Sequence, residues 1–141
     1  MKKLLLLALL LFPVSAHAAT LADFLPSGKK AWSAYQCAEL AGLTGDAEQA
    51  TRLLAIGNAE GKKFVEGTRE MKLTPDDVKG DIVGFKLISI PPASTDFMLG
   101  RMYERAATAN LVAIYQKEND MTKAVETARE QFKSLSCAKV Q

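Results

Sequence analysis

The sequence predicts an all-α protein, a single small antiparallel bundle of four to five helices tied by one disulfide. Apolar residues recur at helical spacing in four segments, and short polar turns separate these segments. Short connections make successive helices antiparallel neighbours. Cys37 and Cys137 lie near the two ends of the predicted domain, so a bridge between them fits a bundle in which the first helix meets the last.

The N-terminus has the three parts of a secretory signal peptide. Two lysines precede a short run of Leu, Ala and Phe, and Ala16 and Ala18 supply the small residues of an A-x-A cleavage site. The run is about half of the ~20 residues that a membrane-spanning helix needs. We therefore expect cleavage of residues 1–18, a single domain over residues 19–141 and no membrane anchor. The short, lysine-led signal is typical of bacteria and predicts a periplasmic location.

Cleavage at this site changes the charge of the chain and removes its histidine. The full chain has 18 Lys and Arg, 16 Asp and Glu, and one His. Without Lys2, Lys3 and His17, basic and acidic residues balance and the formal charge is zero. A neutral chain argues against a nucleic-acid partner, because neutralising phosphates requires a basic face, and we expect none.

The two cysteines are expected to form a disulfide. In an oxidising compartment an even pair is more often bridged than free. The alternative is a pair of buried thiols. A catalytic C-x-x-C pair is excluded, because Cys37 and Cys137 lie far apart in the sequence.

Two helices are expected in the first half of the domain. After a short lead-in, Ser27 can cap a helix over residues 29–43. Asp46 then starts a second helix that can reach Met71, with Gln49 as its partner in a capping box.

Two glycines share one face of this second helix. Gly57 and Gly61 are four residues apart, and each is about 1 kcal/mol less favourable than Ala inside a helix. A contact that requires glycine should offset this cost. Close packing of another helix is the favoured explanation, and close approach of a ligand or partner is the alternative.

The segment after residue 73 is ambiguous. Thr74 and Pro75 form a strong helix start, followed by two aspartates that favour the positive end of the helix dipole. We expect a short helix that ends near Ser89. Alternating apolar residues also allow a strand, and these are Val83, Phe85 and Leu87.

Two further helices complete the bundle. One of the polar residues at 94–96 caps a helix over about 97–118, and Asp120 caps a last helix that ends near Leu135.

The residue types present exclude most familiar catalytic sites. Without histidine, neither a Ser-His-Asp nor a Cys-His site can form, and a zinc site is nearly excluded. We therefore expect no enzyme activity, no cofactor and no metal. Paired carboxylates, as in glycosidases, stay a weak alternative, with candidates Glu39, Glu60, Glu66, Glu104 and Glu118.

One polar and aromatic cluster on the fourth helix is the candidate binding site. Tyr and Arg often carry the binding energy of interfaces. The candidate residues are Asp96, Arg101, Tyr103, Glu104 and Arg105. The simpler interpretation is a set of ordinary surface charges beside a half-buried tyrosine.

These observations predict a secreted periplasmic protein that acts by binding, with another protein as the expected partner. We favour an inhibitor or an immunity-type protein, because such a role requires only a surface. The alternatives are an acid-stress chaperone and, from a different class, a cell-wall hydrolase. The sequence does not indicate the oligomeric state.

Overall fold

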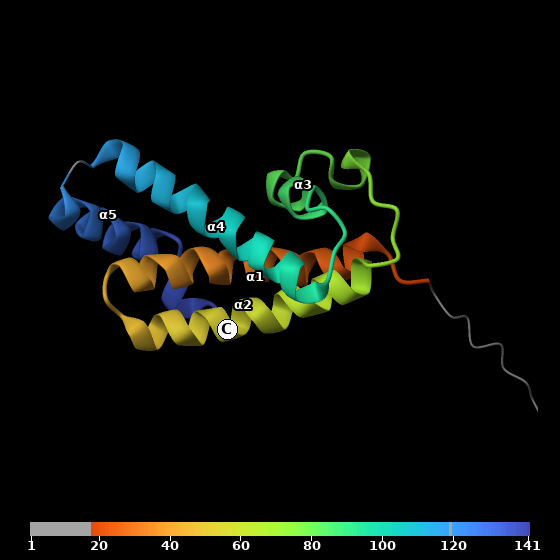
Figure 1. The fold of residues 1–141 in the computed structure, drawn as a ribbon, viewed down its shortest axis with the longest axis horizontal. Coiled ribbons are helices and arrows are strands. Elements are labelled where there is room, and N and C mark those ends of the chain that lie inside the picture. Colours follow the sequence, from red (N-terminus) through yellow and green to blue (C-terminus); the bar gives the residue numbers. More distant parts are fainter. Residues whose placement is uncertain (1–17, 119) are drawn as a thin grey trace, which may run out of the picture.

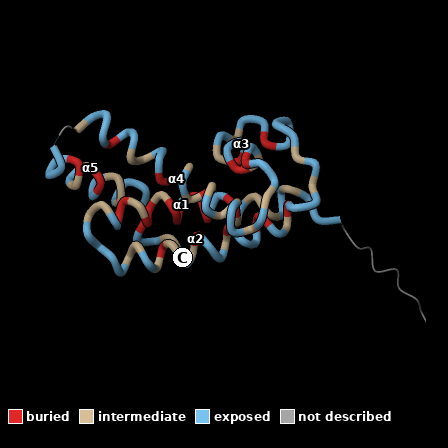
Figure 2. The backbone as a smooth tube through the Cα atoms, viewed as in Figure 1, coloured by how far each residue is buried: buried red, intermediate tan, exposed pale blue. Residues whose placement is uncertain are grey.

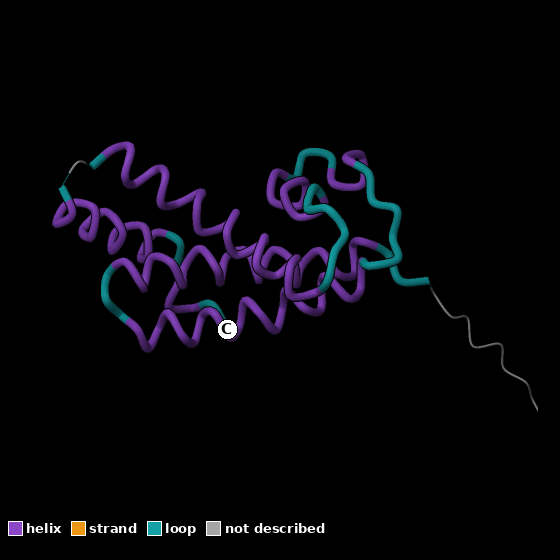
Figure 3. Tube along the Cα trace, viewed as in Figure 1, coloured by secondary structure: helices purple, strands orange, loops and turns teal. Residues whose placement is uncertain are grey.

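The computed structural model describes residues 18–118 and 120–141, and this part of the chain is helical without a strand (Figures 1 and 3). The all-α fold class, the helical bundle and the disulfide are therefore confirmed. Almost all of the predicted signal peptide, residues 1–17, lies outside the described residues. No helix in the described ranges has both the length and the apolar character to cross a membrane.

Helix α1 (Leu21–Leu43) begins earlier than predicted. The Asp23 carboxylate accepts hydrogen bonds from the backbone N–H and the hydroxyl of Thr20, at 2.7 and 2.9 Å, which starts the helix there. The expected start near residue 29 was wrong because Pro26, which cannot donate a helical hydrogen bond, is accommodated inside the helix. Tertiary packing of the first turn stabilises this arrangement, since partly buried side chains there contact the core.

Helix α2 (Ala47–Thr68) lies beside α1 and runs antiparallel to it (Figure 1). Asp46 caps it as predicted, because its carboxylate accepts the backbone N–H of Gln49 at 3.1 Å. The reciprocal bond of the predicted capping box is absent. The Gln49 side chain instead accepts a hydrogen bond from Arg52 Nε at 3.0 Å.

The segment after α2 forms two short helical elements instead of one. The predicted start at Thr74 opens a 3₁₀ turn, η1 (Pro75–Val78), and the chain then breaks at Gly80, whose φ is +81°. Asp81 starts a new helix, α3 (Ile82–Ile88), by accepting the N–H three residues ahead at 2.8 Å. The choice of helix over strand was correct, and the single continuous helix was wrong.

The last two helices follow their predicted caps. Ser94 caps α4 (Thr95–Lys117), and Asp120 caps α5 (Met121–Ser134). A 3₁₀ turn, η2 (Cys137–Lys139), follows.

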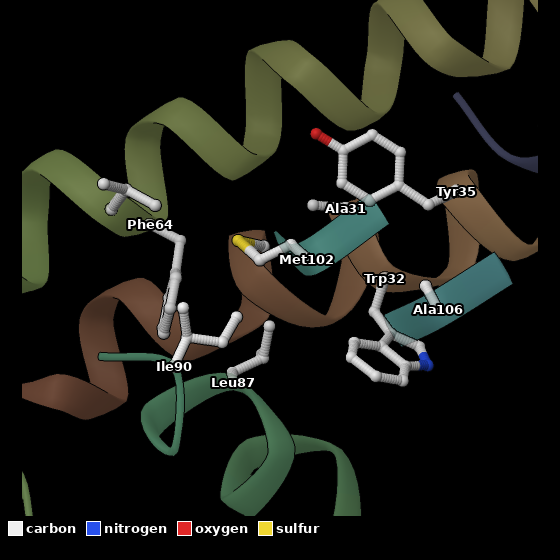
Figure 4. Close-up of a cluster of buried hydrophobic side chains, with 9 residues drawn as sticks. Ala31, Trp32, Tyr35, Phe64, Leu87, Ile90, Met102 and Ala106 are labelled. Atoms are coloured by element: carbon white, nitrogen blue, oxygen red, sulfur yellow. The ribbon is translucent and has the colours of Figure 1, made fainter. Parts of the chain in front are cut away.

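Helix α1 is the centre of the bundle and contacts every other α-helix (Figure 2). The core consists of two clusters along it. The first surrounds the N-terminal half of α1 (Figure 4) and comprises Ala31, Trp32, Tyr35, Phe64, Val65, Leu87, Ile90, Met102 and Ala106. The second surrounds its C-terminal half and comprises Cys37, Ala38, Leu40, Ala41, Leu53, Ile114, Ala124, Ala128 and Cys137.

The predicted disulfide joins Cys37 and Cys137, whose Cα atoms are 5.4 Å apart. The bond connects the middle of α1 to η2, directly after α5. Both cysteines are buried inside the second core cluster. The first helix therefore meets the last, as the cysteine positions predicted.

Glu60 on α2 is held by two lysines. Its Oε1 lies 3.0 Å from Lys63 Nζ and 3.2 Å from Nζ of Lys30 on α1. The hydrogen bond from Lys63 is the main cause that lowers the pKa of Glu60 to about 2. Ser27 and Lys30 act in the same direction, and partial burial opposes them.

Because its folded pKa lies below the ordinary value of 4.5, ionised Glu60 stabilises the fold above about pH 4.5, and this contribution is lost as the pH falls toward 2. Glu60→Gln is expected to lower the free energy of unfolding at pH 7 by up to about 1 kcal/mol. Most of this difference should vanish at pH 2 in urea titrations. Glu66→Gln, which removes an exposed pair with Lys62, is the control and should have almost no effect. Equal losses for Glu60→Gln at both pH values would contradict this assignment.

Candidate functional site

A groove of about 590 Å³ lies between α2 and α4, and we call it the α2–α4 groove. Helix α2 supplies one wall, α4 supplies the other, and Tyr35 of α1 lies between them. The groove is lined by Tyr35, Leu54, Asn58, Ala59, Lys62, Asp96, Leu99, Gly100 and Tyr103.

The spacing of the lining residues follows from helix geometry. Leu54, Asn58 and Lys62 are four residues apart, so they form one stripe along α2. On α4, Asp96 and Tyr103 are two turns apart and also share a face. Two helical faces that meet in this way form an elongated site open to solvent.

Two tyrosines give the groove a rigid floor. Tyr35 is fully buried, and its hydroxyl donates to Asn58 Oδ1 at 2.9 Å. Its ring meets the ring of Tyr103 edge to face, with centroids 5.5 Å apart. The Tyr103 hydroxyl donates to Glu39 Oε2 on α1 at 2.5 Å. Both rings are therefore fixed before any partner binds.

The same contacts keep both phenols protonated. Burial raises the pKa of Tyr35 to about 12. The hydrogen bond to Glu39, followed by burial and the charge of Glu39, raises the pKa of Tyr103 to about 12. Neither tyrosine is suited to act as a base near neutral pH. Tyr103, which is only partly buried, presents ring surface to the groove, and the fully buried Tyr35 supports it through their edge-to-face contact.

Opposite charges stand on the two walls. Lys62 lies on α2, and Asp96 lies in the first turn of α4. The Lys62 side chain is 61% exposed, and its Nζ lies 3.8 Å from the carboxylate of Glu66. At this distance and exposure the pair is weak, so Lys62 can turn toward an acidic group on a partner.

The structure divides the five predicted site residues between two faces of α4. Asp96 and Tyr103 line the groove. Because a helix turns by about 100° per residue, Arg101, Glu104 and Arg105 lie roughly 100° to 200° away from Tyr103 around the helix axis. The sequence grouped these residues correctly by helix but did not separate the two faces.

The residues on the other face have contacts of their own. Arg101 pairs with Glu104 at 2.8 Å. Arg105 Nη1 donates to the backbone oxygen of Lys86 and to Ser89 Oγ, at 3.0 and 2.9 Å. Arg105 therefore holds α4 against the end of α3, which is a structural role.

The candidate carboxylates also have partners in the fold. Among the described residues, no three His, Cys, Asp or Glu side chains gather as a metal site would require. Each candidate acid takes part in an ion pair or a hydrogen bond, and the pairs are Glu39–Tyr103, Glu60–Lys63, Glu66–Lys62, Glu104–Arg101 and Glu118–Lys117.

Comparison of the chain with protein-family models, with curated proteins and with solved structures finds no match.

Gly100 is a position at which a side chain can be added to the groove with little effect on the fold. It lies inside α4, and a Cβ added there would meet no atom within 4 Å. Gly100→Ala is expected to raise the free energy of unfolding by about 0.5–1 kcal/mol, through helix propensity alone. Urea unfolding measures this change. A destabilised Gly100→Ala protein would mean that a neighbouring group occupies the groove beside Gly100.

Proposed function

We propose that the protein acts by binding another protein, as an inhibitor or immunity-type protein, and that the α2–α4 groove receives that partner. The observation that carries the proposal is the groove itself. It combines fixed aromatic rings and apolar side chains with one exposed charge on each wall. An apolar centre with a polar rim is the usual composition of a protein interface.

The rigidity of the floor supports this function. Tyrosine is enriched among residues that dominate binding energy. Tyr35 and Tyr103 are already ordered by their hydrogen bonds to Asn58 and Glu39, so a partner would not have to immobilise them. The bare backbone at Gly100 lets a partner side chain or helix approach closely.

The Lys62 and Asp96 charges give the proposed interface a direction. A partner segment with an acidic group toward α2 and a basic group toward α4 would complement both walls. The reversed segment would place like charges together.

Site-specific photocrosslinking in the cell of origin tests the proposal. A photoreactive amino acid at Gly100 or Ala59 is expected to give one discrete crosslinked product, whose partner mass spectrometry identifies. The same amino acid at Glu130, on α5 and outside the groove, is the control and should not give this product. The same product from all three positions, or none from the two groove positions, would count against the groove as the binding site.

We also propose that the protein works in the periplasm after cleavage of residues 1–18. The disulfide supports this location, because such bonds persist in oxidising compartments. Mass spectrometry of the periplasmic protein is expected to find a chain that begins at Ala19. A chain that retains His17 would contradict the proposed cleavage.

A further inference from the structure

A second, more enclosed pocket lies near the N-terminal half of α1, away from the disulfide. It has a volume of about 400 Å³ and is formed where residues 69–73 and residues 90–93 come together beside α3. We call it the loop pocket. Its volume falls within the range of about 300–1,000 Å³ that is usual for small-molecule sites.

The interior of the loop pocket is apolar. Phe64 of α2, Leu87 of α3 and Ile90 form its inner surface, and Figure 4 shows these side chains pointing toward one another. Met98 of α4 and Met71 line it closer to the surface, and methionine side chains adapt readily to varied apolar ligands.

Two cations border this apolar interior. Arg69 and Lys72 both line the loop pocket, and neither has an ion-pair partner among the described residues. Arg69 Nη2 donates to Thr95 Oγ1, which holds the guanidinium between the end of α2 and the start of α4. Glu70 lies between the two cations in sequence but does not line the pocket.

The side chains, and not the helix dipoles, determine which ligand charge the opening of the loop pocket favours. The C-terminal ends of α2 and of the short helix α3 and the N-terminal end of α4 all border the pocket, so their partial charges partly offset one another. Arg69 and Lys72 then leave a net positive edge next to an apolar cavity.

We propose that the loop pocket binds a single-chain amphiphile, with its hydrocarbon chain against Phe64, Leu87 and Ile90 and its anionic head group at Arg69 and Lys72. A fatty carboxylate and a monoalkyl phosphate share this chemistry. This site is separate from the α2–α4 groove, so the proposal does not depend on the proposed function.

Calorimetric titration of the intact, oxidised protein tests the proposal directly. Dodecanoate, below its critical micelle concentration, is expected to bind saturably with one molecule per chain. Affinity should rise about fourfold with each added methylene from octanoate until the cavity is full. The same titration with dodecyl phosphate shows whether the site prefers a phosphate or a carboxylate head group. Dodecyltrimethylammonium has the same chain with the opposite charge and should bind at least tenfold more weakly.

Trp32 provides a second readout within the protein. It is the one tryptophan of the chain and belongs to the same core cluster as Phe64 and Leu87. Its fluorescence should change in proportion to the saturation that calorimetry measures.

Two sets of variants locate the site. Arg69→Gln with Lys72→Gln should weaken dodecanoate binding at least tenfold. Lys123→Gln with Lys133→Gln removes the same charge from α5, outside both the loop pocket and the α2–α4 groove, and should change the affinity for dodecanoate less than twofold. Ala93→Phe, which places a ring in the pocket, should abolish binding, with its unfolding midpoint confirming the fold. Absence of saturable binding, equal binding of the cationic amphiphile, or unchanged binding by folded Ala93→Phe would each overturn the proposal.

Discussion

Replacing Cys37 with Ser is expected to lower the free energy of unfolding by roughly 4–5 kcal/mol, the value that a loop of about 100 residues predicts in the chain-entropy account. The bond joins residues 100 apart in sequence, so it restricts nearly the whole unfolded domain. It also holds the end of α5 and η2 against the middle of α1. Urea unfolding of the oxidised protein measures the loss.

Two controls distinguish the effect of losing the disulfide from the effect of changing the side chain. Cys37→Ala avoids burying an unpaired hydroxyl. The decrease in its free energy of unfolding therefore reports the missing disulfide more closely than the decrease for Cys37→Ser. Reducing agent should destabilise the native protein by a similar amount and leave both variants unchanged. Two titratable thiols in the folded, oxidised protein would contradict the disulfide.

Gly57→Leu is expected to lower the free energy of unfolding by more than about 2 kcal/mol, because overpacking a close contact typically costs 1–3 kcal/mol. A Cβ at this position would lie 2.5 Å from Cε1 of Tyr35. That ring cannot move away easily, since its hydroxyl is bonded to Asn58 and its other neighbour is the ring of Tyr103. Close packing against α1 is therefore the reason for glycine here.

Substitutions at Gly61 and Gly42 are expected to cost less stability than the same substitutions at Gly57. A Cβ at Gly61 would meet the flexible end of Leu99 at 2.7 Å, so Gly61→Ala should cost less than Gly57→Ala. A Cβ at Gly42, near the end of α1, would meet nothing within 4 Å, so Gly42→Leu should be tolerated. Urea titrations rank the variants. A Gly57→Leu protein as stable as Gly42→Leu would show that the contact with Tyr35 is not tight.

Local chemistry made much of the fold predictable. Asp46 and Asp120 cap the helices that the sequence assigned to them, because a cap depends only on residues two or three positions away. The disulfide was predictable because its two cysteines lie near the ends of a chain with short connections.

The predictions of the fold were wrong where tertiary contacts outweighed local sequence signals. Ser27 was expected to cap the first helix, yet the residues before it are already helical and contribute partly buried side chains to the core. The break at Gly80 was missed because the strong start at Thr74 favoured one continuous helix.

The candidate site was only half predictable. Helical periodicity placed Asp96 and Tyr103 on α4, but the opposite wall of the groove was missed. Asn58 and Lys62 were not singled out from the sequence, and the four-residue spacing between them was the available signal. Which face of α2 meets α4 depends on how both helices pack on α1, and the sequence of neither helix specifies that register.

The most direct test of the central claim is the dissociation constant for the crosslinked partner, measured with purified native protein, Gly100→Ala and Gly100→Arg. A Cβ at Gly100 would meet no atom within 4 Å, so we expect Gly100→Arg to place its side chain in the groove without disturbing the core. We expect Gly100→Arg to bind at least tenfold more weakly and Gly100→Ala to bind within about twofold of the native protein, with both variants fully folded. A folded Gly100→Arg protein that binds the partner with the native dissociation constant would contradict the account.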